Sequence, residues 1–349
     1  MAYTTIDDPT EHFQTKLWTG NATNRTIDLD ENATMQPDFS WVKSRSNTYE
    51  PYMQNSTSGT SKYLRSHSSS SEQNGTVVTY NSSGFGIGSG AENNVNNTTN
   101  VGWFWKGNGG TTSSLTGGNI NSVVQVNQTA GFSIVTYTGN TGTGQSVNHG
   151  LGVTPTFIMV KKISGTGDWY VYNRKLGNTK HMHLNNQNAV STTSDFGNYG
   201  PNADSFYVSG GTCENASNYI AYCFADIQGY SKFSSFIANG QADGPFVYTG
   251  FKPGLVILRN TTNSGYNWWM LDSKRNEFNL TDLILYTNGT WAEYDGSGHA
   301  SNMGVDFLSN GFKLRSSNGK YNGLGSDYAY AAFVDFPFVS SNSKIGTAR

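Results

Sequence analysis

Two histidines stand one residue apart in a segment that is predicted to be a β-strand. His181 and His183 would project from the same face of that strand, because alternate side chains point the same way. Imidazoles so placed can hold a metal ion, but a metal site needs three or four ligands, and no third ligand stands at a recognisable spacing. We therefore predict two solvated histidines and no metal site. His149, in the turn 148–152 before another predicted strand, is predicted to stabilise that turn.

Acid–base chemistry of the glycosidase kind would need paired carboxylates at set distances. The candidate pairs are Asp7 with Asp8, Asp28 with Asp30, and Asp282 with Glu277. None falls in a framework that recurs along the chain, so we interpret them as solvated loop carboxylates. A Gly-x-Ser-x-Gly elbow is absent, and the glycine run 86–90 lacks the strand–helix context and the basic residue of a phosphate loop. The sequence predicts no catalytic residue, no cofactor and no enzymatic activity.

Aromatic side chains are the remaining chemical signal. Sugars are commonly held by aromatic faces together with amide and carboxylate hydrogen bonds. The polar segment 288–299 contains Trp291 and Tyr294, and Trp269 directly follows Trp268. Neighbouring strand residues point to opposite faces, so one of these two tryptophans should lie in the core and the other on a second buried surface or in solvent. Trp269, Trp291 and Tyr294 are the candidate ligand-binding residues, and a role in capping the fold or in meeting a neighbouring subunit stays open.

Composition limits the classes of protein that fit. The 349 residues are 35% hydrophobic, 13% aromatic and 13% charged, with a net charge of −2. At roughly 100–200 residues per domain, two or three domains are expected. The near-neutral charge excludes a nucleic-acid arm or a basic membrane-surface helix as the main function. No apolar run approaches the ~20 residues of a membrane span, and residues 1–16 show no signal peptide. Two cysteines, Cys213 and Cys223, cannot support a disulfide-rich scaffold, and Cys223 is predicted to be a buried thiol.

The chain repeats one unit three times. Each copy has an aromatic opening, a turn with Gly and Asn, a proline, a β-branched strand and a closing basic residue; these basic residues are Lys43, Lys161 and Arg259. Each copy ends on an aromatic strand, at residues 101–105, 219–224 and 328–333. Units of about 100 residues are too long for a solenoid, whose repeats run about 20–50. They indicate three domains or closely joined lobes.

The predicted fold is all-β, with three tandem antiparallel β-sandwich repeats of jelly-roll or lectin-like type. The predicted repeats span residues 1–118, 119–233 and 234–349. Residues 280–286 could form a helical turn or a strand. Residues 111–126 are the predicted linker between repeats 1 and 2, whereas residues 229–233 leave almost no spacer between repeats 2 and 3. We therefore expect repeat 1 to be more independent and repeat 3 to pack closely on repeat 2.

The segments 1–21, 229–251, 268–275 and 305–314, with the Pro-x-Phe-x-x-Val-Lys strands, resemble a family of repeat-containing virion proteins from marine tailed phages. The resemblance covers essentially the whole chain. It implies a structural virion component, similar to tail fibre or appendage proteins with lectin-like domains, and it supplies no catalytic residue. Repeat 1 departs from the pattern: Met35 and Gln36 replace a Gly-Phe pair before Pro37, and no central tryptophan strand is evident near residues 49–53. This departure makes repeat 1 a candidate attachment domain.

The sequence therefore predicts a tail fibre or tail appendage protein that recognises a host-surface glycan. One alternative is a capsid decoration or head-fibre protein that binds only other virion proteins. Another is a glycan-degrading enzyme on a β-sandwich. In both virion hypotheses the partners are other virion proteins and copies of the chain itself, as a homo-oligomer and, for a fibre, a trimer. Neither involves nucleic acid or membrane insertion. The expected location is the tail or capsid surface of the virion, after synthesis in the host cytoplasm.

Overall fold

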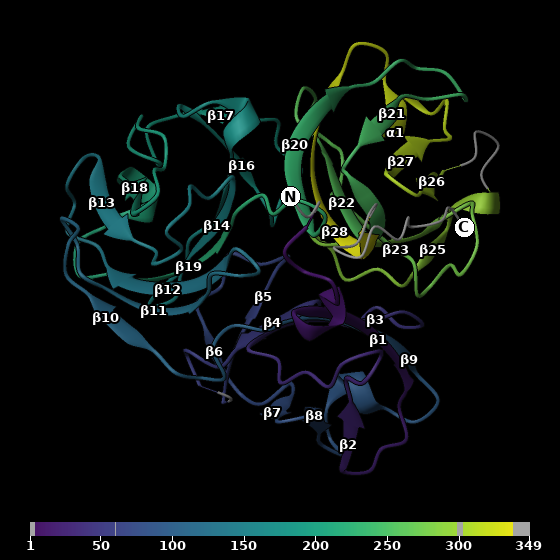
Figure 1. The fold of residues 1–349 in the computed structure, drawn as a ribbon, viewed down its shortest axis with the longest axis horizontal. Helices are drawn as coiled ribbons and strands as arrows, with labels where there is room; N and C mark the ends of the chain where they lie inside the picture. The colour runs from purple at the N-terminus through teal and green to yellow at the C-terminus, as the bar shows by residue number, and fades with distance from the viewer. Residues whose placement is uncertain (1–3, 60, 299–302, 338–349) are drawn as a thin grey trace.

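Three lobes surround a common centre in the computed structural model of the chain, which describes residues 4–59, 61–298 and 303–337 (Figure 1). The purple-to-blue lobe holds repeat 1, the teal lobe repeat 2 and the green-to-yellow lobe repeat 3. Short strands dominate every lobe, because runs rich in Val, Ile, Tyr, Phe and Trp alternate with Gly, Asn, Ser and Thr turns. The predicted all-β class and its three antiparallel sandwich repeats are confirmed.

Each lobe pairs a larger with a smaller antiparallel sheet, and six strands of the larger sheet follow the same order in all three. In repeat 1 this order is β1 (Phe13–Thr19), β9 (Thr99–Trp105), β3 (Phe39–Ser44), β4 (Tyr52–Asn55), β5 (Lys62–Arg65) and β6 (Gln73–Asn74). In repeat 2 it is β12 (Phe132–Thr138), β19 (Asn218–Phe224), β14 (Phe157–Lys162), β15 (Trp169–Asn173), β16 (Lys180–His183) and β17 (Ser191–Thr192). In repeat 3 it is β20 (Ser231–Ile237), β28 (Asp327–Pro337), β22 (Phe251–Asn260), β23 (Trp269–Asp272), β24 (Leu283–Tyr286) and β25 (Tyr294–Asp295).

The smaller sheets and short helices complete each sandwich. The smaller sheets are β2 (Arg25–Asp28), β8 (Gly84–Ile87) and β7 (Thr79–Asn81) in repeat 1, β13 (Gln145–Asn148) and β18 (Ser205–Val208) in repeat 2, and β21 (Phe246–Tyr248), β27 (Gly311–Leu314) and β26 (Val305–Leu308) in repeat 3. The helical turns are η1 (Pro9–Glu11), η2 (Glu92–Asn94), η3 (Arg174–Leu176), η4 (Gly210–Thr212), η5 (Gly296–Gly298) and α1 (Gly319–Asn322). One of them precedes the last large-sheet strand of each repeat: η2, η4 and α1. Residues 280–286, for which a helical turn or a strand was expected, contain strand β24 and no helix.

Both faces of each larger sheet are buried, which explains the continuous aromatic runs. In β9, Trp103 and Trp105 point to the centre of the molecule, whereas Phe104 points into the sandwich of repeat 1. In β19, Phe224 points to the centre and Cys223 into the sandwich of repeat 2. This alternation is the period of two expected of a strand.

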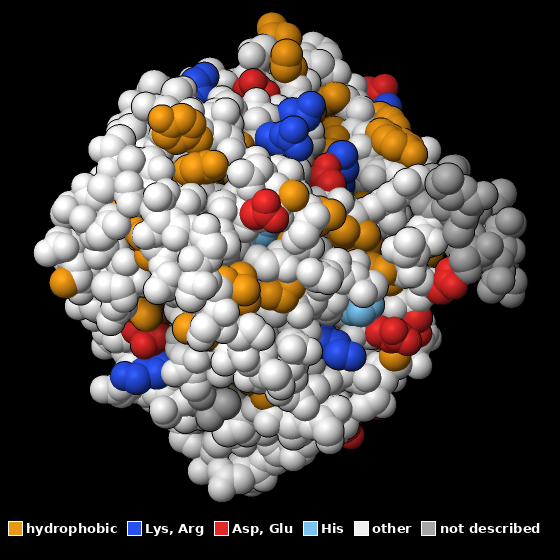
Figure 2. All heavy atoms as spheres, turned by 60° about the vertical axis from the view of Figure 1, so that its left-hand side comes forward, with side chains coloured by type: hydrophobic (Ala, Val, Ile, Leu, Met, Phe, Trp, Pro, Cys, Tyr) orange, Lys and Arg blue, Asp and Glu red, His pale blue; other side chains and the backbone are white. Residues whose placement is uncertain are grey.

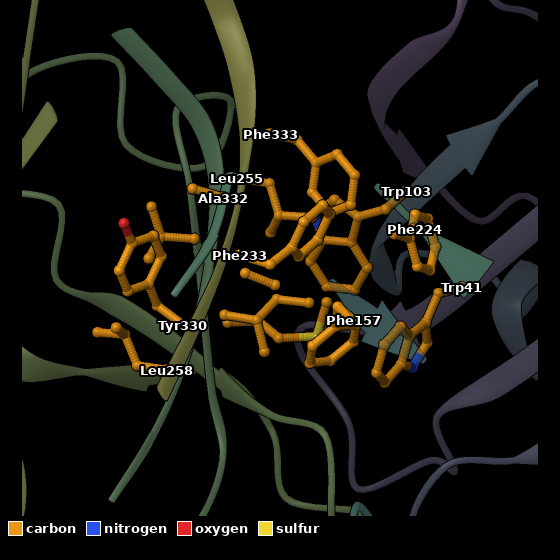
Figure 3. Packing of buried hydrophobic residues seen from close by; sticks show 14 of the residues in the cluster. Trp41, Trp103, Phe157, Phe224, Phe233, Leu255, Leu258, Tyr330, Ala332 and Phe333 are labelled. Carbon is orange, nitrogen blue, oxygen red and sulfur yellow. The ribbon is translucent and has the colours of Figure 1, made fainter. Parts of the chain in front are cut away.

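An aromatic triad, one ring from each repeat, forms the centre. Trp105, Phe224 and Phe333 occupy equivalent positions, each opposite the third strand of its sheet at Phe39, Phe157 or Leu255. The ring centroids of the triad lie 6.2, 5.3 and 5.6 Å apart, all in edge-to-face geometry. Figure 3 shows Phe224 and Phe333 within this cluster.

The predicted independence of repeat 1 is therefore wrong. One hydrophobic cluster draws on all three repeats, and repeat 1 contributes buried tryptophans to it. The predicted linker 111–126 also fails as a spacer, because it contains β10 (Ser113–Leu115) and most of β11 (Ser122–Asn127), which extend the edge of the repeat 2 sheet. Gln125 of β11 donates to Ser56 and Thr57 of repeat 1, which joins the two repeats directly.

The contacts between repeats run in a ring. Trp169 Nε1 of repeat 2 donates to Arg65 O of repeat 1 at 3.0 Å, and Trp268 Nε1 of repeat 3 donates to His183 O of repeat 2 at 2.9 Å. In repeat 1 the equivalent position is Pro51, just before Tyr52, so this donor is missing there. Instead, the ring closes where Ser66 Oγ donates to Thr287 O of repeat 3 at 2.5 Å.

The recurring basic residues are structural. Lys43, Lys161 and Arg259 are almost fully buried at the end of the third strand of each sheet. Their nitrogens donate to backbone carbonyls, and two of them reach the preceding repeat: Lys161 bonds to Ser69 O and Arg259 to Asn188 O. Burial lowers the pKa of Lys43 and of Lys161 to about 8. A repeated basic residue thus satisfies carbonyl groups that would otherwise be buried without a partner.

The molecular surface is polar with few charges. Figure 2 shows one face on which uncharged polar atoms dominate and charged side chains are scattered. Among the described residues, no helix has the length and apolar character needed to cross a bilayer.

Candidate functional site

The candidate site lies on the sandwich side of strands β23 and β24 in repeat 3. Trp269 of β23 pairs in register with Tyr286 of β24. The helix α1 places Tyr321 against Trp269, with ring centroids 3.7 Å apart. The hydroxyl groups of Tyr286 and Tyr321 are 3.3 Å apart, so the three side chains form one continuous aromatic base.

Trp291 and Tyr294 extend this base to the surface. The ring of Trp291 meets Tyr286 edge-to-face at 5.8 Å, and it lies so close over Gly289 that a Cβ there would clash with it. Tyr294 pairs with Ile284, two residues before Tyr286, so both pairs share one side of the sheet. Trp291 is 49% exposed and Tyr294 is 38% exposed.

The three predicted binding residues therefore lie in one cluster, with different roles. Trp269 is only 4% exposed, so it supports the surface and cannot present a face to a ligand. Its neighbour Trp268 lies on the opposite side of the strand, at the contact with repeat 2. Both tryptophans are buried, on two different surfaces, which is one of the two predicted arrangements. His299, at the end of the predicted binding segment, lies outside the described residues.

A partly buried ion network fixes the loop between Trp291 and Tyr294. Glu293 accepts two hydrogen bonds from Arg45 of repeat 1, at 2.9 and 2.8 Å, and one from Arg275 at 3.0 Å. The Glu293 backbone N–H also donates to Arg45 O at 2.7 Å. Burial opposes ionisation of Glu293, but hydrogen bonds and charge from the two arginines outweigh it and lower its pKa.

The same network continues into the centre of the molecule. Arg275 is fully buried and also donates to Asp272, which accepts a further bond from Trp103 Nε1 of repeat 1 at 3.2 Å. The loop that carries the exposed aromatics is thus held by repeats 1 and 3 together.

Acidic and hydroxyl groups border the aromatic surface. Asp295 is exposed, and hydrogen bonds from Ser297 lower its pKa. Asp282 is buried, and burial, followed by the charge of Asp295, raises its pKa against the hydrogen bond from Asn276. The nearby arginines already bind carboxylates, so the surface favours neutral or cationic ligands over anionic ones.

In repeat 1 the strand pair that corresponds to Trp269 and Tyr286 is Tyr52 and Arg65, and ionic and hydrogen-bond contacts cover it. Tyr52 donates to Glu92 of η2 at 2.6 Å and meets Tyr63 edge-to-face at 5.3 Å. Arg65 pairs with Glu50 and lies over the Tyr63 ring.

In repeat 2 the corresponding strand pair is Tyr170 and His183, so the histidine pair lies at this position. His181 and His183 lie beside Tyr170, with ring centroids 5.1 and 5.2 Å from it. The prediction of two solvated histidines is wrong, because they are 2% and 8% exposed. The covering segment includes Asp195, whose carboxylate accepts from Gly211 N of η4. Burial and the neighbouring ring lower the pKa of His181 to about 4, and burial lowers that of His183.

Asp8, Asp28 and Asp30, from the candidate carboxylate pairs, have structural partners. Asp8 caps η1 by accepting from Thr10 N at 3.0 Å. Asp28 accepts from Ser83 Oγ, and Asp30 pairs with Lys16 at 3.1 Å. Leu151 N–H donates to His149 Nδ1 at 3.1 Å, which gives His149 the predicted turn role. Both cysteines are free and buried.

Another groove lies at the rim between repeats 1 and 2. It has a volume of about 770 Å³ and is walled mainly by Ser, Thr and Asn side chains. The tyrosines in its wall, Tyr137 and Tyr219, are buried and use their hydroxyls within the fold. The groove offers no exposed aromatic face, so we rank the repeat 3 surface above it.

Comparison with protein families gives one match, to a domain of unknown function, DUF7483, over residues 8–337. The chain belongs to the DUF7483 family. No curated protein and no solved structure matches it. The DUF7483 match spans all three repeats, so the family unit is the closed ring of lobes and not a single lobe.

The sequence did not reveal Tyr286 and Tyr321 of this DUF7483 chain. They lie 17 and 52 residues from Trp269, and only folding brings them together. The signal that could have found Tyr286 is the repeat itself. Tyr286 occupies the same place in repeat 3 as Arg65 in repeat 1 and His183 in repeat 2. Each pairs in register with an aromatic residue of the preceding strand: Trp269, Tyr52 and Tyr170, respectively.

Proposed function

We propose that this DUF7483 chain is a structural protein of a tailed-phage virion, a tail fibre or appendage component, that binds host-surface glycans through Trp291 and Tyr294. The resemblance of its repeats to marine phage virion proteins supports the virion role. The proposal for the site rests on one observation: two exposed aromatic side chains flank Glu293, which is clamped by Arg45 and Arg275.

A clamped loop is suited to sugar binding for an energetic reason. Ordering a mobile side chain on binding costs about 0.5–1.5 kcal/mol, and that cost is avoided where the fold has already fixed the loop. Aromatic rings provide apolar faces for sugar C–H groups, while Asp295 and Ser297 provide polar partners. The acidic border favours neutral or amino sugars.

One chain arranges three lobes about the aromatic triad. Assembly into a homo-oligomer and contact with other virion proteins are part of the proposal.

The test is a screen of the purified chain on an array of neutral, amino and acidic glycans, followed by calorimetry on the best ligand. We expect Trp291→Ala and Tyr294→Ala each to weaken binding by at least tenfold. Tyr199→Ala is the matched control, because Tyr199 is 58% exposed but lies in repeat 2. Equal binding by all three variants would refute the site. Absence of glycan binding, with the chain present in purified virions, would favour the capsid decoration alternative.

A further inference from the structure

The histidine pair of repeat 2 has an unusual arrangement of hydrogen-bonding groups. The two Nε2 atoms face each other at 3.2 Å. On the far side of each ring an acceptor faces Nδ1: Thr193 Oγ1 and Asp195 Oδ2 lie 3.0 and 3.5 Å from His181 Nδ1, and Asp168 Oδ2 lies 3.6 Å from His183 Nδ1.

These neighbours decide where the protons of His181 are. Thr193 has one hydroxyl hydrogen and donates it to Asp195. Its oxygen is therefore an acceptor toward His181, so His181 carries its proton on Nδ1 and presents a lone pair at Nε2.

Each neutral tautomer of His183 then leaves the lone pair of one ring nitrogen without a donor. With its proton on Nδ1, toward the Asp168 carboxylate, its Nε2 lone pair faces that of His181 at 3.2 Å. With its proton on Nε2, His183 donates to His181 Nε2, but its Nδ1 lone pair then faces the carboxylate, and Nδ1 is buried without a hydrogen bond. A cation between the two Nε2 atoms removes the conflict, because it accepts both lone pairs while both Nδ1–H groups face acceptors.

We propose that His181 and His183 bind a divalent transition-metal ion such as Zn²⁺ through their Nε2 atoms. Two imidazoles on a tetrahedral zinc, with Zn–N of about 2.0–2.1 Å, place their nitrogens about 3.3 Å apart. The separation here is 3.2 Å. The carboxylates of Asp195 and Asp168, at 3.5 and 3.6 Å from the two Nδ1 atoms, lie on the side where partners orient metal-bound histidines through the second ring nitrogen.

Water would have to supply the remaining ligands of the ion. Among the described residues, no third His, Cys, Asp or Glu joins the pair in a metal-binding group. The Asp168 side chain is 39% exposed and marks the side of the pair nearest to solvent. A site with two protein ligands binds more weakly than a structural zinc site, so we expect a dissociation constant in the micromolar range and exchange with chelators. This proposal is independent of glycan binding.

The experiment is a calorimetric titration of Zn²⁺ into the full chain stripped with EDTA, with Co²⁺ absorption as a second readout. We expect one ion per chain and a visible d–d band of Co²⁺ bound through nitrogen. His183→Gln should lower affinity at least a hundredfold. Asp168→Asn keeps both ligands and should lower affinity by about 10–100-fold. His67→Gln is the control, because His67 lies in repeat 1 and its ring faces Glu50.

Two results would overturn the proposal. One is an absence of saturable binding to the wild-type chain at 1 mM metal. The other is binding that is unchanged in a folded His183→Gln variant, which would place the ion elsewhere. If His183→Gln does not fold, Asp168→Asn decides alone: unchanged affinity in this variant rejects the site.

Discussion

Replacing Phe333 by alanine tests whether the three repeats fold as one unit. Phe333 is 3% exposed and meets four aromatic rings from all three repeats: Phe13, Trp105, Phe224 and Phe233, at 5.2–5.6 Å. A buried Phe→Ala change typically costs about 3–5 kcal/mol. We take about 4 kcal/mol, because each ring pair adds about 0.5–1.5 kcal/mol beyond burial and the central site cannot collapse easily.

The expected shift in melting temperature depends on the size of the cooperative unit. At about 2.1 cal/mol/K per residue, the unfolding entropy of 349 residues is about 0.7 kcal/mol/K, so Phe333→Ala should lower one shared Tm by about 5 °C. If repeat 3 unfolded alone, with about a third of that entropy, its own Tm would fall by about 17 °C while the others stayed unchanged.

Differential scanning calorimetry and hydrogen exchange separate these outcomes. We expect one transition in the wild type and in the variant, with faster exchange in the central strands β9, β19 and β28 alike. Phe336→Ala is the control, because Phe336 lies on the same strand but is 49% exposed. Two transitions, with loss of protection confined to repeat 3, would falsify the single-core argument.

Three further predictions concern buried polar groups. Arg275→Met leaves the buried Asp272 carboxylate without its cationic partner, whereas Glu293 keeps Arg45, and should cost about 3–5 kcal/mol, measured by urea unfolding. Trp268→Phe removes the donor to His183 O and should cost about 1–3 kcal/mol; a loss below 0.5 would mean that this contact is replaced by water. Burial lowers the pKa of His149 and of His181, so the unfolded chain binds more protons; stability should be full above pH ~6.5 and fall on acidification toward pH 4. His149→Gln should flatten that decline in urea midpoints recorded across the range.

The all-β repeats were predictable because their signals are local. Prolines, Gly and Asn turns and aromatic runs recur in each copy and set the same strand order. The burial of His181 and His183 was not predictable, because it depends on Asp195 and Gly211, which come from a covering segment without strand periodicity. Strand β11 was missed because the glycine-rich turns around it are typical of a linker.

The candidate site was predictable in part. Trp291 and Tyr294 stood out as aromatics in a polar segment, and they are exposed in the structure. The clamp on Glu293 was hidden, because Arg45 lies 248 residues away in another repeat. Long-range ion pairs of this kind have no signature in one sequence.

The closed ring of lobes has a consequence for how such a chain can be divided. In a solenoid, a repeat can be removed and its neighbours restack. Here a fragment with one lobe would expose the central face that carries Trp105, Phe224 or Phe333. Such a fragment has a simple way to bury that face again, which is to associate with two copies of itself around the same axis. The three lobes of one chain thus occupy the places that three identical subunits would occupy in a trimer, and each lobe can carry a different surface.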